Sequence, residues 1–185
     1  MTDDDLPLRL SVDVDGCFPE VVAGHQRAVY TIALRISGRP EDAADMAAEA
    51  FLRAYAALRD YPAGRIVELR LRPWLATIVL NVARNAARAT SRRPRQTVLE
   101  PWADSSDRGE GPEDHASRHD GQARLGALLT DLPEVQRVAV VLRHVVGLSY
   151  DDIVDVMGCP EGTAKSHVSR GLRRLRSRLT EEAQP

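Results

Sequence analysis

Residues 149–179 constrain the fold of this chain more than any other stretch. Ser149 and Asp152 have the spacing of a capping box, which predicts that a helix begins there. Gly158 and Pro160 end that helix after about two turns. The second helix that follows has an apolar stripe on one face and arginines on the other. This order is typical of a helix-turn-helix motif, which places its second helix in the major groove of DNA. A solvated basic helix in an unrelated bundle remains the alternative.

The charge of the chain is segregated, although the formal net charge is only −2. Residues 1–15 and 96–121 are acidic, whereas residues 84–95 contain five arginines and no acid. Two basic segments separated by acidic ones favour nucleic-acid binding at two places, despite the average charge. No apolar run approaches the roughly 18 residues of a membrane span, and no signal peptide is recognisable. We therefore expect a cytoplasmic chain that does not insert into the membrane on its own.

Three further helices are predicted upstream of this motif, at about residues 18–37, 41–61 and 73–91. Gly38 ends the first, and Pro40 suits the first turn of the second. Helices of this length make one compact three-helix bundle. On the third helix, the side chains expected in the core are Trp74, Leu75, Ile78, Val82 and Ala86.

The third helix also has a polar stripe, because Asn81, Arg84, Asn85 and Arg88 recur at i, i+3, i+4 and i+7. An asparagine side chain carries both a hydrogen-bond donor and an acceptor, so it suits the edge of a base. Amides on a solvated helix surface would give the same spacing.

Composition divides the chain into two small helical domains. Pro, Gly, Ser and Asp are abundant in the segment between the two groups of helices, which predicts a flexible acidic linker. We expect an all-α chain, with a disordered acidic lead at 1–16, a three-helix domain at 17–93, the linker at 94–122 and a helix-turn-helix domain at 123–181.

The longest recognisable motif runs from Leu128, LLTDLPEVQRVAVVLRHVVGLSYDDIVDVMGCPEGTAKSHVSRGLRRLRSRL. Its LPEVQR start and its GT-x-KS segment resemble domain 4 of bacterial sigma factors of the extracytoplasmic-function group, group 4 of the sigma-70 family. Residues 42–58 and 72–93 are similar to the polymerase-binding and promoter-melting stretches of domain 2. The chain departs from the family at Ala48, where Gln is usual, and at Ala76 and Thr77, where an aromatic residue or Arg is commoner.

This resemblance implies a role for three groups of residues. The residues it places on the upstream (−35) promoter element are Thr163, Lys165, Ser166, Ser169, Arg170, Arg173 and Arg174. Those for reading and melting the −10 element are Asn81, Arg84, Asn85 and Arg88. Asp45 and Glu49 are implied to bind core RNA polymerase.

The function implied is that of an alternative sigma factor. Such a protein directs core RNA polymerase to promoter DNA and takes part in melting it. The resemblance also implies an anti-sigma factor that masks these surfaces until a signal arrives. Two other hypotheses fit part of the pattern: a one-component repressor or activator that binds duplex DNA alone, and a polymerase-bound regulator that never reads DNA.

Known catalytic motifs are missing from the sequence. The GCPEGTAKS segment lacks the spacing and the second glycine of a phosphate-binding loop, and H-E-x-x-H and G-x-S-x-G do not occur. His115 and His119 lie four apart without a third metal ligand, and Cys17 and Cys159 are too isolated for a zinc site. We expect a protein that is not an enzyme and binds neither cofactor nor metal.

Overall fold

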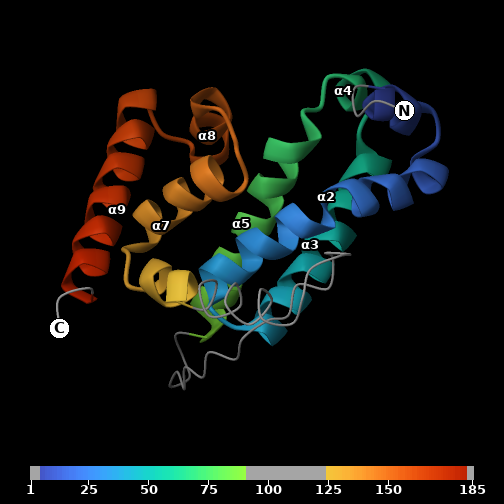
Figure 1. Ribbon diagram of the computed structural model, residues 1–185. Coiled ribbons are helices and arrows are strands. Elements are labelled where there is room, and N and C mark those ends of the chain that lie inside the picture. Colours follow the sequence, from blue (N-terminus) through green and yellow to red (C-terminus); the bar gives the residue numbers. More distant parts are fainter. Residues whose placement is uncertain (1–4, 91–123, 183–185) are drawn as a thin grey trace, which may run out of the picture.

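The computed structural model describes residues 5–90 and 124–182, and all regular structure in these ranges is helical (Figure 1). The expectation of an all-α chain is confirmed. A short helical segment at residues 124–130 opens the second range. The other helices are α1 (Leu6–Val12), α2 (Val14–Ser37), α3 (Pro40–Asp60), α4 (Ala63–Val67), α5 (Leu71–Thr90), α7 (Glu134–Val140), the π-helical turn η2 (Val141–Val145), α8 (Tyr150–Met157) and α9 (Glu161–Glu182). The predicted linker, with His115 and His119, lies outside the described residues.

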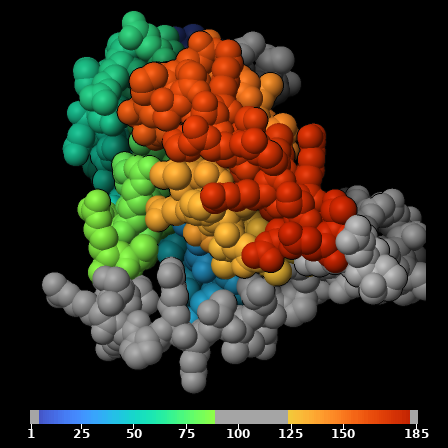
Figure 2. Space-filling model, turned by 90° about the vertical axis from the view of Figure 1, so that its left-hand side faces the viewer, coloured from blue at the N-terminus to red at the C-terminus, as the bar shows by residue number. Residues whose placement is uncertain are grey.

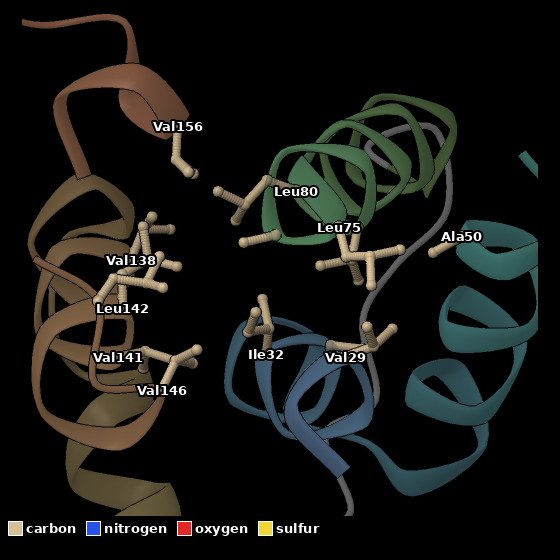
Figure 3. Packing of buried hydrophobic residues seen from close by; sticks show 14 of the residues in the cluster. Val29, Ile32, Ala50, Leu75, Leu80, Val138, Val141, Leu142, Val146 and Val156 are labelled. Carbon is tan, nitrogen blue, oxygen red and sulfur yellow. The ribbon is translucent and has the colours of Figure 1, made fainter. Parts of the chain in front are cut away.

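Helices α2, α3 and α5 pack together into the first domain (Figure 1). Gly38 adopts the left-handed conformation, with φ of 73°, and ends α2 as the sequence predicts. On α3 the buried side chains are mostly alanines, which let the neighbouring helices approach closely. The core between the three helices includes Val29, Ala50 and Leu75 (Figure 3).

The prediction of a disordered acidic lead is wrong for residues 5–16. Leu6 and Leu10 lie one turn apart and are buried, so α1 packs against α2 and α4. Both guanidinium nitrogens at the end of the Arg9 side chain donate to the Glu20 carboxylate, at 2.6 and 2.5 Å. Asp13 caps α2 by accepting from the Gly16 amide. The acidic composition of this segment hides a short apolar stripe, and Asp13 is a helix cap.

The second domain contains the helix-turn-helix motif. The Ser149 hydroxyl accepts from the Asp152 amide at 3.1 Å, while the Asp152 carboxylate accepts from the Ser149 amide at 3.0 Å. This confirms the predicted capping box at the start of α8. Gly158 has φ of 63° and ends α8, after which α9 begins. The helix-turn-helix prediction is thereby confirmed.

Close approach of α7 to α9 depends on Gly171. A Cβ atom added there would lie 2.6 Å from a methyl carbon of Val140 and 3.3 Å from the Gln136 carbonyl oxygen.

We expect Gly171→Ala to lower the free energy of unfolding by about 1–3 kcal/mol, because the core must shift to admit the methyl group. Gly162→Ala is the matched control on α9. A Cβ atom at Gly162 meets nothing within 4 Å, so alanine should stabilise the helix by about 0.5 kcal/mol. Urea denaturation of both variants checks this, and equal stability would contradict it.

The two domains lie directly against each other. Helices α2 and α5 of the first domain contact α7, η2 and α8 of the second, and the buried side chains form one continuous cluster. Figure 2 shows the green and the yellow-to-orange parts of the chain in contact along this boundary. We call this boundary the interdomain seam, formed by α2 and α5 on one side and by α7, η2 and α8 on the other.

Candidate nucleic-acid interface

Helix α9 buries one face and exposes the opposite one. Ala164, Val168 and Leu175 recur at i, i+4 and i+11 and are buried, with Gly171 on the same side. All the residues predicted to contact the −35 element are exposed, except Ser166, which is partly buried: Thr163, Lys165, Ser166, Ser169, Arg170, Arg173 and Arg174. Ser166, Arg170 and Arg173 lie about opposite the buried stripe. The helix therefore exposes a polar and cationic face, while its opposite, apolar face is packed against the rest of the domain.

Lys165 is held in place by its neighbours on both helices of the motif. Its ammonium group lies 2.5 Å from the Glu161 carboxylate and 5.4 Å from the centre of the Tyr150 ring. The hydrogen bond that the Lys165 ammonium group donates to the Glu161 carboxylate raises the pKa of Lys165, so the side chain keeps its charge. A second cation, the Arg143 guanidinium, lies 4.9 Å from the centre of the Tyr150 ring. Arg143 also donates a hydrogen bond to the Leu148 carbonyl oxygen at 2.7 Å. Tyr150 was not predicted as a functional residue from the sequence, although its position directly after the capping Ser149 was a usable signal.

Helix α5 displays the predicted polar stripe. Asn81, Asn85 and Arg88 are exposed, and Arg84 is partly buried. The buried face of this helix is wider than expected, because α5 packs against its own domain and against the second domain. The side chains that cover these two contacts are Leu71, Leu75, Ala76, Val79, Leu80, Val82 and Ala83.

Trp74 and Ile78 pack against the core as predicted from the sequence, but they lie at its edge. Both are half-buried, and Trp74 lies seven residues before Asn81, which places it on the side of the polar stripe. The Trp74 ring lies 6.3 Å from the ring of Tyr61, and Arg65 lies 3.7 Å above that tyrosine ring. Two aromatic rings and a cation therefore lie on the same side of α5 as the asparagines, about two helical turns before Asn81. The i to i+7 spacing could have revealed this from the sequence.

Helix α3 carries the acidic pair predicted to bind polymerase. Asp45 is exposed, and Glu49 is half-exposed and accepts from Arg53 at 2.7 Å. Ala48 and Leu52 share this face by helical spacing, and Leu52 is 65% exposed. An exposed leucine beside two acids is a mixed surface of the kind that binds another protein. Leu52 was not predicted as a surface residue from the sequence.

The described residues hold no group of three or more His, Cys, Asp or Glu side chains arranged to bind a metal ion. In the same ranges Cys17 and Cys159 are free thiols, each half-buried and in a different domain. No helix in the described parts of the chain combines the length and the apolarity needed to cross a membrane.

Comparison with known families matches both domains. The family described as Sigma-70 region 2 matches residues 21–93, and the family described as Sigma-70, region 4 matches residues 122–175. The first match spans α2 to α5, and the second spans the helix-turn-helix motif.

The chain is also similar to characterised sigma factors. It is 33% identical over 168 residues to the ECF RNA polymerase sigma factor SigE of Mycolicibacterium smegmatis, and the match covers 89% of this chain and 62% of SigE. It is 32% identical to the RNA polymerase sigma-H factor of Pseudomonas aeruginosa, covering 83% of this chain and 81% of that protein. It is 30% identical to the ECF RNA polymerase sigma-E factor of Escherichia coli K12, and the match covers 92% of this chain and 90% of that protein.

Solved structures share the whole arrangement. CnrH in complex with the cytosolic domain of CnrY superposes with a TM-score of 0.71 at 26% identity, over 99% of each chain. RpoE of Bartonella quintana, in complex with the anti-sigma factor NepR, has the same fold, with a TM-score of 0.67 at 23% identity over 88% of this chain and 96% of that one. Since the two family matches cover both domains, and since the sigma-H and sigma-E relatives are matched over 81% and 90% of their own length, the chain belongs to the extracytoplasmic-function RNA polymerase sigma factors, which direct transcription initiation.

Proposed function

We propose that this chain is a group 4 sigma factor whose two domains read two promoter elements, with α9 on the −35 element and α5 on the −10 element. The observation that carries this assignment is the pair of polar faces on α5 and α9, each exposed on a helix whose other side is buried. The chain acts in the cytoplasm and carries no covalent chemistry of its own, because core polymerase supplies the catalytic site.

In the second domain, α9 enters the major groove with its first turns toward the bases. Arg170 reaches a guanine with two parallel hydrogen bonds, and Lys165 reaches guanine or phosphate. Arg173 and Arg174 lie further along the helix and bind phosphates, which orient the helix without reading sequence. The Glu161 and Tyr150 contacts of Lys165 support this role because they keep its ammonium group near the turn.

The assignment of α9 predicts different defects for two exposed arginines. Arg170→Ala should weaken binding of the preferred −35 element by roughly 1–3 kcal/mol and relax the base preference there. Arg174→Ala should weaken binding evenly across sequences and reduce the salt slope by about one. Competition with single-base promoter variants, at several salt concentrations and in the presence of core polymerase, measures both. Wild-type base preference in both variants would contradict this use of α9.

In the first domain, α5 binds a DNA strand that has separated from the duplex. Asn81 and Asn85 offer donors and acceptors to base edges, and Arg84 and Arg88 track phosphates. The half-buried Trp74, beside Tyr61 and Arg65, adds a ring on which an unstacked base can lie. This ring offers a stacking surface that Thr77 and the buried Ala76 do not.

The face of α3 that carries Asp45, Glu49 and Leu52 binds a basic surface of core polymerase. The exposure of these side chains supports this assignment. The two structurally similar sigma factors were solved with CnrY and NepR. A corresponding anti-sigma factor regulates the present chain by covering surfaces that polymerase or promoter must contact.

A further inference from the structure

Lys165 is the only lysine in a chain whose lysine and arginine residues number 25. It lies in the second turn of α9, among the side chains assigned to the −35 element. The two kinds of cation are not interchangeable, because an ammonium group is a compact charge with three donors, whereas a guanidinium is a planar fork with five. The contacts around Lys165 suit the compact group.

Glu161 holds the Lys165 ammonium group across one helical turn. The acid lies four residues before the lysine, which is the favoured order for an ion pair on a helix, and Nζ lies 2.5 Å from its Oε1. Long side chains on a helix point toward its N-terminus, so the ammonium group lies over the first turn of α9. That turn is the part of a recognition helix that reaches base edges. Glu161 therefore balances the charge of Lys165 at the place where α9 meets DNA.

Tyr150 supports the same ammonium group from the first helix of the motif. Its ring centre lies 5.4 Å from Nζ of Lys165, within the range of a cation–π interaction. The ring is held in place, because Tyr150 is half-buried, packs against the hydrophobic core and lies in the capped first turn of α8. We call Tyr150, Glu161 and Lys165 the lysine clamp.

The lysine clamp distinguishes between the two kinds of acceptor that DNA offers. Glu161 takes one of the three ammonium donors, and the other two can reach O6 and N7 of one guanine. These base atoms belong to a neutral group, so the Glu161 carboxylate repels them little. A phosphate carries a full negative charge and would lie close to that carboxylate, which repels it. The clamp therefore favours a base edge over the DNA backbone.

We propose that Glu161 and Tyr150 are positioning residues, which direct Lys165 to a guanine of the −35 element and keep it off the phosphates. The inference rests on the proposed function, in which α9 lies in the major groove, and it decides between the two acceptors that Lys165 can reach there. Because the charges of Glu161 and Lys165 cancel, the pair displaces no counterion from DNA. Lys165 thus contributes to base preference and not to salt dependence.

Binding of the holoenzyme to promoter fragments with single-base changes in the −35 element, at several salt concentrations, tests the proposal. Lys165→Met should reduce the preference for one guanine at least about 5-fold and leave the salt slope unchanged. Glu161→Gln should release the cation to a phosphate. All sequences should then bind more tightly, the salt slope should steepen by about 0.9, and the preference for that guanine should fall.

Glu181→Gln is the matched control for Glu161→Gln. It removes one negative charge and one exposed ion pair, with Arg178, from the same helix, several turns away from the clamp. This variant should keep the wild-type salt slope and base preference. An equal steepening in Glu181→Gln would mean that the net charge of the domain, and not the clamp, governs the salt slope.

The role of Tyr150 is tested by its ring. Tyr150→Leu should lower the preference for the same guanine about 2- to 5-fold, whereas Tyr150→Phe, which keeps the ring, should retain it. In the Lys165→Met background Tyr150→Leu should have no further effect on that preference, because the side chain that it positions is gone. A further loss of the same size in this background would show a merely structural role and overturn the assignment of Tyr150.

The lysine clamp can also be observed in the free chain, because a protein labelled with ¹³C-lysine gives the signals of Lys165 alone. Relaxation of its Cε carbon reports the mobility of the side chain. Mobility should rise in Glu161→Gln and in Tyr150→Leu, and should stay at the wild-type level in Glu181→Gln. Equal mobility in all four proteins would show that no clamp exists.

Two results with the holoenzyme would overturn the proposed role of the clamp. A lower salt slope in Lys165→Met would show that Lys165 binds a phosphate, and a wild-type slope and preference in Glu161→Gln would show that Glu161 does not direct it. If the wild-type holoenzyme has no base preference in the −35 element, the proposed function fails, whereas the mobility of Lys165 in the free chain still decides whether the clamp exists.

Discussion

Replacing both Asn81 and Asn85 by alanine should abolish promoter opening and leave binding of the upstream element intact. The two domains read different parts of the promoter, so the second domain still holds its duplex. The first domain loses the polar groups that it offers to unstacked bases. Each lost base contact costs roughly 1–3 kcal/mol, so the double variant should form open complexes at least about 30-fold less well. Both side chains are exposed, so the fold should barely change.

Permanganate footprinting reads this outcome from the reactivity of unpaired thymines near the −10 element. A pre-melted template is the control, because the strands are already separated and part of the activity should return. Normal thymine reactivity in the double variant would mean that opening depends on other residues, with Trp74 and Tyr61 the next to replace.

Reversing two charges on α3 should abolish binding to core polymerase. Asp45→Arg with Glu49→Arg places two cations against the basic surface that these acids are proposed to meet, and like charges at an interface cost several kcal/mol. The Glu49–Arg53 pair that is lost lies on the surface, where such a pair contributes at most about 1 kcal/mol. Thermal denaturation should therefore show a folded protein that no longer co-purifies with polymerase.

The matched control for this variant reverses two exposed acids of the other domain. Asp155→Arg with Glu181→Arg changes the net charge by the same amount, and it should leave co-purification with polymerase unchanged. Equal loss in both double variants would mean that net charge, and not the α3 face, governs the interaction. If the α3 variant still binds polymerase, then Asp45 and Glu49 are not part of the interface.

Features fixed by local rules could be predicted from the sequence. The capping box at Ser149 and the glycine stop at Gly158 depend on residues within one turn, and both occur where expected. The stripe through Asn81 and Asn85 follows from helical periodicity alone, and both side chains are exposed. Their roles on DNA remain a prediction.

Features that depend on contacts between distant segments could not be predicted in the same way. The periodicity of α5 shows that Leu75 and Leu80 are apolar, but not that Leu80 points toward a second domain while Leu75 points into its own (Figure 3). The ion pair of Arg70 with Asp152 joins residues 82 positions apart, and no local pattern connects them. Trp74 was predicted to face the core because its spacing with Ile78 and Val82 fits a helix, and in this fold it packs at the edge of the core, on the side of the polar stripe.

Run-off transcription with core polymerase tests the central claim most directly. The chain, core polymerase and genomic DNA fragments are combined, and the RNA start sites are mapped. We expect discrete start sites that appear only when this chain is added and that share a −35 and a −10 element. The isolated chain should bind the same fragments only weakly, because a single recognition module buries just about 600–1,000 Å². No chain-dependent start site, together with nanomolar sequence-specific binding by the chain alone, would contradict this account and identify a repressor or activator that acts without polymerase.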